Sequence, residues 1–177
     1  MSGLTRRAAL AAALAAAVAR PGPAAAAAKG DAAVLTDLLR IEHAAAFAYG
    51  AAVSSGSARA RAVARAFAAQ EAEHVAALET ALEALGAPKP PPPASAEQVD
   101  ALARELQIAP VLGELRSGRD VLTFLLALED ALVARWAGAH RRLQDGRLLQ
   151  TATSILACQA QHAVVLREAL GRDPLGR

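Results

Sequence analysis

Gln70-Glu71-Ala72-Glu73-His74 lies in the middle of a long alanine-rich helical pattern. Glu71 and His74 are three residues apart, so a helix places the carboxylate and the imidazole side by side on one face. A single Glu-x-x-His pair arises by chance in many acidic helices. It indicates a site only where the rest of the chain supplies partners for it.

The chain contains a second, altered copy of this stretch, Gln159-Ala160-Gln161-His162. The likeness extends upstream, where Leu39-Arg40-Ile41-Glu42 matches Leu126-Ala127-Leu128-Glu129. From the glutamate of the upstream match to the first residue of the motif is 29 residues in one copy and 30 in the other. The sequence is therefore an internal repeat of a two-helix unit.

The composition of the 177-residue chain predicts an all-α fold of one domain. Hydrophobic residues make up 54% of the chain but aromatic residues only 3%, and most of the apolar total is alanine, leucine and valine. Alanine and leucine favour helices, and a sheet would lack the β-branched and aromatic residues it needs.

Apolar residues spaced for one helix face predict four long helices. Asp31 can cap the first, which runs to about Val53. The second ends at Gly86 and Pro88, in the order typical of a helix C-terminus. The third and fourth are expected at 120–143 and 148–170.

The connection between the second and third helices is long and rich in proline. Residues 88–93 must be extended, because proline has a fixed φ and no N–H donor. Ser95-Ala96-Glu97-Gln98 reads as a capping box that opens a short extra helix to about Gln107, and residues 108–119 are irregular. Two helical hairpins joined by one long crossover is the layout of ferritin-like four-helix bundles.

The four repeated positions lie at similar heights along such a bundle. Glu42 lies 14 residues before Gly56 and Glu71 lies 15 after it. In the second hairpin Glu129 lies 16 residues before Asp145 and Gln159 lies 14 after it. At 1.5 Å rise per residue, the mismatch within each hairpin is about one to three ångströms. We expect the four side chains to meet at mid-bundle, where converging carboxylates need a cation or protons.

These residues resemble those of the ferritin-like superfamily, and specifically its small exported bacterial members with a twin-arginine leader. The di-iron site of that superfamily uses one Glu from each of two helices and Glu-x-x-His from the other two. The resemblance implies that the chain binds metal ions, iron or manganese, in a site of six residues. These are Glu42, Glu71, His74, Glu129, His162 and, as a weak ligand, Gln159.

Gln159 departs from the family pattern, which has glutamate at that position. A neutral amide oxygen is a poorer ligand for a hard cation and does not bridge two ions as a carboxylate does. Two divalent ions bring four positive charges, against three carboxylates here. One well-held ion, a weak or mixed pair, and no metal at all remain open in that order, with Glu71 and His74 as the better-preserved half. Glu73 or Asp130 is a candidate to replace the missing carboxylate.

Other conspicuous residues have simpler interpretations. Tyr49 and Trp136 each lie seven residues after a repeated glutamate and are expected to pack in the core, although Tyr49 is close enough to matter for redox chemistry if iron binds. We expect His43 and His140 at the surface, and Cys158, the single cysteine, as a small buried residue.

Residues 1–28 have the layout of a cleaved signal peptide, with the mature domain at 29–177. Arg6 and Arg7 precede a weakly apolar run and a tract of small residues with Ala-x-Ala sites. The apolar run is too short to span a bilayer, and the paired arginines resemble a twin-arginine export signal. An ordinary secretory signal or an uncleaved anchor is the alternative. We therefore expect export to the periplasm, cell envelope or medium.

The charge of the mature chain argues against nucleic-acid binding. The whole sequence has a pI of about 9.2, but removal of Arg6, Arg7 and Arg20 leaves 16 basic and 17 acidic residues. The leading functional hypothesis is a metal-binding protein with a degenerate di-iron-type site, an oxidoreductase of ferroxidase type if it is active. The alternatives are a helical cell-envelope module that has lost the metal and a storage or stress protein that acts as an assembly, which leaves a homo-oligomer open.

Overall fold

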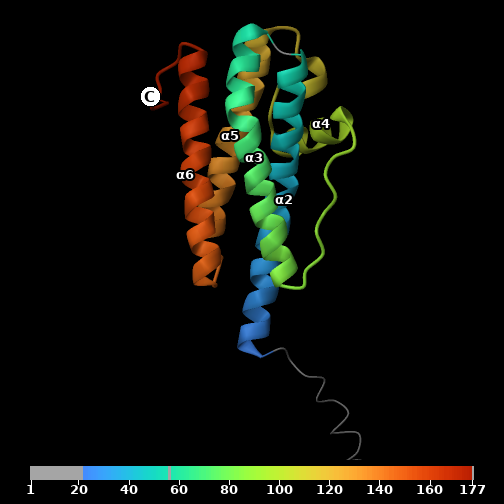
Figure 1. Ribbon diagram of the computed structural model, residues 1–177, viewed down its shortest axis with the longest axis vertical. Helices are drawn as coiled ribbons and strands as arrows, with labels where there is room; N and C mark the ends of the chain where they lie inside the picture. Colours follow the sequence, from blue (N-terminus) through green and yellow to red (C-terminus); the bar gives the residue numbers. More distant parts are fainter. Residues whose placement is uncertain (1–21, 56, 177) are drawn as a thin grey trace, which may run out of the picture.

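The structure, a computed structural model, describes residues 22–55 and 57–176, and these are all-helical without strands. Two antiparallel hairpins form a four-helix bundle, as predicted (Figure 1). The hairpins are α2 (Pro23–Ser55) with α3 (Ala58–Ala84), and α5 (Gly118–His140) with α6 (Gly146–Ala169). The arginine pair of the predicted export signal lies outside the described residues.

The crossover carries the chain from the end of α3 back along the whole bundle to the start of α5 (Figure 1). It contains α4 (Ala96–Glu105) and the 3-10 turn η1 (Leu112–Glu114). Val99 and Ala103 of α4 are buried, and Arg40 of α2 lies 3.4 Å from Glu105 in an exposed ion pair. Because the chain returns along the bundle before α5 begins, α5 runs antiparallel to α2, and the two hairpins point in opposite directions.

The first helix begins earlier than the sequence pattern predicts. It starts at Pro23 rather than near Asp31, because proline is favoured at a first helical position and the following alanines have the highest helix propensity. Asp31 is 2% exposed and lies within α2 instead of capping it: its carboxylate accepts hydrogen bonds from the backbone N–H groups of Gln144 (2.9 Å) and Asp145 (3.1 Å), just before α6. No described helix combines the length and apolar character needed to cross a membrane.

The second helix of each hairpin ends in the same way, which extends the internal repeat to the backbone. Gly86 and Gly171 have φ of 64° and 70°, a left-handed conformation that favours glycine. In each case the next residue closes the helix with a backbone hydrogen bond, from Ala87 N to Leu82 O (2.9 Å) and from Arg172 N to Arg167 O (2.8 Å).

The predicted capping box of α4 is not formed. The Ser95 hydroxyl makes no capping hydrogen bond, and the side chain of Gln98 accepts from Ala94 N (2.8 Å), one residue before the N-cap. A complete box opens α5 instead, where Ser117 Oγ accepts from Asp120 N (3.1 Å) and Asp120 accepts from Ser117 N (2.8 Å). This box explains why α5 begins at Gly118.

The core consists mainly of leucines, with alanines where helices approach closely. Fully buried leucines come from all four long helices, and Ala45 and Ala48 of α2 are 0% exposed. Each buried leucine contributes roughly 1.5–3 kcal/mol of transfer free energy. This apolar core surrounds the middle of the bundle, so any polar side chain there is removed from water.

We predict that Gly118→Ala destabilises the protein, because the start of α5 touches the N-cap of α3. A β-carbon at position 118 would lie 2.1 Å from Ser57 Oγ and 2.5 Å from Ser57 Cβ. The expected loss in unfolding free energy is about 1–3 kcal/mol, measured by urea denaturation. The same change in a Ser57→Gly background should cost much less, since glycine as an N-cap costs only a few tenths of a kcal/mol. Equal costs in both backgrounds would contradict the close approach.

Candidate metal centre

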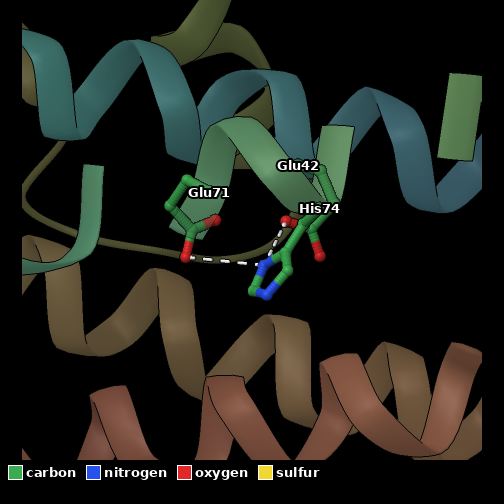
Figure 2. Close-up of side chains that lie close together, drawn as sticks. All are labelled: Glu42, Glu71 and His74. Atoms are coloured by element: carbon green, nitrogen blue, oxygen red, sulfur yellow. Dashed lines mark ion pairs between the residues drawn. The ribbon is translucent and has the colours of Figure 1, made fainter. Parts of the chain in front are cut away.

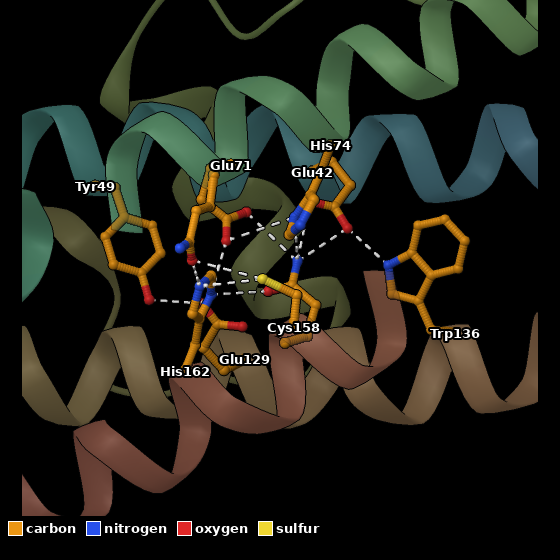
Figure 3. Close-up of polar contacts among 10 residues, drawn as sticks. Glu42, Tyr49, Glu71, His74, Glu129, Trp136, Cys158 and His162 are labelled. Carbon is orange, nitrogen blue, oxygen red and sulfur yellow. Dashed lines mark hydrogen bonds and ion pairs between the residues drawn. The ribbon is translucent and has the colours of Figure 1, made fainter. Parts of the chain in front are cut away.

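The six predicted site residues are buried together in the middle of the bundle, and all of them except Gln159 are labelled in Figure 3. Every long helix contributes at least one of them. Four are 0% exposed, His162 is 1% exposed and His74 is 7% exposed. The set is Glu42 on α2, Glu71 and His74 on α3, Glu129 on α5, and Gln159 and His162 on α6.

The donor atoms form two groups of three residues that share Glu71. Glu42, Glu71 and His74 form the first group (Figure 2), and Glu71, Glu129 and His162 form the second. Within each group the donor atoms lie within 4.8 Å of one another. Carboxylate oxygens with one imidazole nitrogen are a ligand set suited to transition metals. Each group could hold one metal ion, with the Glu71 carboxylate between the two.

Each hairpin supplies an aromatic hydrogen-bond donor to the glutamate of the other hairpin. Trp136 Nε1 donates to Glu42 Oε1 at 2.6 Å, and the Tyr49 hydroxyl donates to Glu129 Oε1 at 2.5 Å. The two rings lie at opposite ends of the cluster in Figure 3. The sequence predicted both only as core residues; they are buried, but their polar ends also position the carboxylates.

The His162 ring is held by three residues outside the six. Phe67 stacks on it with ring centroids 4.0 Å apart, Gln70 Oε1 lies 2.5 Å from Nε2, and Cys158 Sγ lies 3.6 Å from Nε2. With Nε2 donating to Gln70, Nδ1 faces the carboxylates of Glu71 (3.0 Å) and Glu129 (3.3 Å). A partner on the outer nitrogen is the usual way to orient a ligating histidine. Gln70 and Cys158 lie four residues before His74 and His162, and this helical spacing is the sequence feature that could have placed both beside the site.

The nitrogen of His162 that faces the cluster carries a proton in this arrangement. Burial would lower the pKa of His162, but its hydrogen bond to Glu129 and its ion pair with Glu71 raise it to about 9. The carboxylates of Glu42 and Glu71 outweigh burial in the same way and raise the pKa of His74 to about 11. An N–H of Gln159 lies 3.3 Å from His74 Nδ1 and opposes a proton there, so His162 is the better-defined proton carrier.

The three carboxylates differ in how well their charge is balanced. Burial raises the pKa of Glu129 to about 7, in spite of its hydrogen bond to His162. Burial would also raise the pKa of Glu71, but its ion pairs with His162 and His74 lower it to about 2. Burial raises the pKa of Glu42 as well. Glu71, which both groups share, is therefore the carboxylate held most firmly in its charged form.

A divalent cation fits this cluster because buried oxygens in it lack partners. Among the described residues, Glu129 Oε2 and Glu71 Oε1 are buried atoms without a hydrogen bond, although Glu71 Oε1 pairs electrostatically with His162. An oxygen without a partner in a buried site costs roughly 1–3 kcal/mol, and more when it is charged. Two of the side-chain atoms left unsatisfied in the described core are thus donor atoms of one potential metal position.

Several side chains lie elsewhere than the sequence suggests. Glu73 and Asp130, the candidate replacements for the missing carboxylate, are exposed, and Asp130 pairs with Arg167 at 2.5 Å. His43 is 5% exposed rather than at the surface, because its turn of α2 faces α3, where its Nε2 lies 3.5 Å from Glu79. His140 is exposed, as expected. Cys158 is only half-buried, because it lies at the outer edge of the cluster beside the exposed Gln70.

The proton on His162 predicts that the metal-free protein loses stability between pH 7 and 9. A pKa raised from about 6.5 in the unfolded chain to about 9 in the fold stabilises fully below pH 6.5, and the contribution is lost as pH rises to 9. The melting temperature of chelator-treated protein should fall across this window. In His162→Gln the fall should shrink. A wild-type melting temperature that stays constant or rises from pH 7 to 9 would contradict the assignment.

Comparison with known proteins agrees with this architecture. Residues 30–172 match the model of the ferritin-like domain family. A crystal structure of the conserved hypothetical protein Rv2844 from Mycobacterium tuberculosis is similar in fold, with a TM-score of 0.68 and 18% identity. The match covers 82% of this chain and 93% of that one. No curated protein matches the chain. The family match spans the whole bundle and all six clustered residues, and the chain belongs to the ferritin-like domain family.

Proposed function

We propose that this protein is an exported ferritin-like protein that binds iron or manganese at the cluster between its four helices. The observation that carries the proposal is the pair of donor groups sharing Glu71, buried at the centre of the bundle. Charged carboxylates are expensive to bury without a compensating cation or proton. Their assembly from four separate helices favours a site built for a ligand over a chance cluster.

The residues that would hold the ions are the carboxylates and the Nδ1 atoms of the two histidines. Bound iron in such a centre would supply redox chemistry with oxygen. The contributions of the chain itself are narrower. Tyr49 holds its proton on the hydroxyl that faces Glu129, since burial and the Glu129 charge raise the pKa of the phenol well above its ordinary value. The surrounding apolar core excludes water from the donor atoms.

The competing function is a helical envelope module without metal. One observation favours it: protons and N–H groups already face much of the carboxylate charge, including those of His162, Gln159, Trp136 and Tyr49. The two functions differ in a simple measurement, because only a metal-binding protein gains stability from an added ion.

We predict that wild-type protein retains iron or manganese on purification and that added Mn²⁺ raises its melting temperature. An ion at 100 times its Kd adds about 2.7 kcal/mol to the free energy of unfolding. His74→Ala and His162→Ala should each reduce this gain, while His140→Ala, which changes an exposed histidine outside the cluster, should preserve it. Elemental analysis and thermal melts measure both effects. A wild-type protein whose melting temperature ignores Mn²⁺ and Fe²⁺ supports the metal-free module instead.

Export belongs to the same proposal and rests on the arginine pair of the N-terminal segment. Replacing Arg6 and Arg7 together by lysine should abolish export of a reporter fused to the chain, because twin-arginine signals are read by the pair itself. Arg20→Lys is the matched control, with the same charge and chemistry outside the pair. Fractionation of cells expressing each fusion measures the result. Normal export of the double variant would indicate a general secretory signal.

A further inference from the structure

The side-chain nitrogen of Gln159 lies at the centre of the first donor group. Its Nε2 is 3.0 and 3.1 Å from the two oxygens of Glu42, 3.4 Å from Glu71 Oε2 and 3.3 Å from His74 Nδ1. It therefore contacts all three residues of the Glu42–Glu71–His74 group at once. A cation bound by that group would need the place that this nitrogen takes.

The orientation of the amide follows from its neighbours. Carboxylates accept hydrogen bonds and do not donate them, so the NH₂ of Gln159 must face Glu42 and Glu71. The other end of the amide, Oε1, then points toward the second group and lies 3.1 Å from His162 Nδ1. A flipped amide would bring its oxygen against two carboxylates. The single amide thus gives donors to one group and an acceptor oxygen to the other.

The two groups also differ in which oxygens are satisfied. Both oxygens of Glu42 accept hydrogen bonds from the amide nitrogen of Gln159, and Glu42 Oε1 also accepts one from Trp136 Nε1. Of the buried oxygens without a hydrogen bond, Glu129 Oε2 belongs to the second group alone, and the shared Glu71 Oε1 lies nearer to His162 Nδ1 (3.0 Å) than to His74 Nδ1 (3.8 Å). Unsatisfied donor atoms for a cation are therefore concentrated beside Glu129 and His162.

Charge leads to the same half of the cluster. Once His162 Nδ1 has released its proton to solvent, Glu71 and Glu129 together neutralise one divalent ion, and Gln159 Oε1 adds a neutral oxygen without altering that balance. A second divalent ion would have only Glu42 left to balance it. It would also have to displace the N–H groups of Gln159, and the amide offers no second oxygen with which to bridge two ions.

We propose that the centre holds a single divalent cation, bound by Glu71, Glu129, His162 and Gln159 Oε1, with the Gln159 NH₂ group substituting for the second ion beside Glu42. This inference rests on the proposed metal-binding function and assigns its stoichiometry and its position. It reverses the expectation from the motif, in which Glu71 and His74 form the better-preserved half. Gln159 replaces a glutamate three residues before His162, yet the group that it keeps from binding an ion is the one that contains His74.

Zn²⁺ titration of chelator-treated protein by isothermal calorimetry tests the position with matched variants. Wild type should bind one Zn²⁺ per chain. Glu129→Gln should weaken binding at least ten-fold more than Glu42→Gln, and His162→Gln should weaken it more than His74→Gln. The histidine pair keeps the test decisive if a glutamate variant fails to fold, which circular dichroism reports. The reverse order in either folded pair overturns the proposal.

The single tryptophan gives a readout that does not depend on any substitution. The indole N–H of Trp136 reports on Glu42 through their 2.6 Å hydrogen bond. In a ¹H–¹⁵N spectrum its resonance should remain downfield, with the hydrogen bond intact, when Zn²⁺ is added to one equivalent. A large upfield shift would show that the ion takes Glu42 from the indole, and would overturn the assignment.

Gln159→Glu removes the amide donor and restores a bridging carboxylate, so this variant should bind two Zn²⁺ per chain. Two ions in the wild type, or one ion in both proteins, would overturn the role given to the amide. These failures differ from failure of the proposed function. A wild type that binds no Zn²⁺, Mn²⁺ or Fe²⁺ refutes metal binding itself, whereas one ion in the wrong half refutes only this inference.

Discussion

The constraint on which the rest of the structure depends is the burial of three carboxylates at the centre of a helical bundle. Glu42, Glu71 and Glu129 are each 0% exposed, so their charges must be balanced from within the fold. Because the balancing groups come from all four long helices, the height and rotation of every helix are coupled to this cluster. The burial of the apolar leucine core offsets the free-energy cost of burying these polar groups.

The two-fold repeat of the chain supplies part of the groups that balance the buried carboxylates. The glutamate of each copy accepts a hydrogen bond from an aromatic residue of the other copy: Glu42 from Trp136, and Glu129 from Tyr49. The chain holds one tryptophan and one tyrosine, and both are placed at these matching positions. The exchange requires the two hairpins to face each other antiparallel, and the long crossover is what allows it (Figure 1).

The parts of the structure that sequence predicts well are those determined by local geometry. Helix rise alone places Glu42 level with Glu71 and Glu129 level with Gln159; donor atoms of the first pair lie within 4.8 Å of each other, and Gln159 contacts Glu42 at 3.0 Å. Contacts that depend on how neighbouring helices are rotated were missed. His43 is buried against α3, Asp31 accepts hydrogen bonds from the backbone just before α6, and Gln70 reaches His162 from another helix. Each involves a partner at least 36 positions away, about which the local pattern carries no information.

Gln159 shows why a single change from carboxylate to amide alters a buried site more than its surface chemistry suggests. A glutamate there would add a fourth negative charge and require more cation. The amide is neutral and carries both donors and an acceptor, so one side chain can satisfy Glu42 and still turn an oxygen toward His162. The bundle thereby keeps one half of its centre assembled without an ion. The proposed single ion would then lie on the other side of the amide, where Glu129 Oε2 is buried without a hydrogen bond.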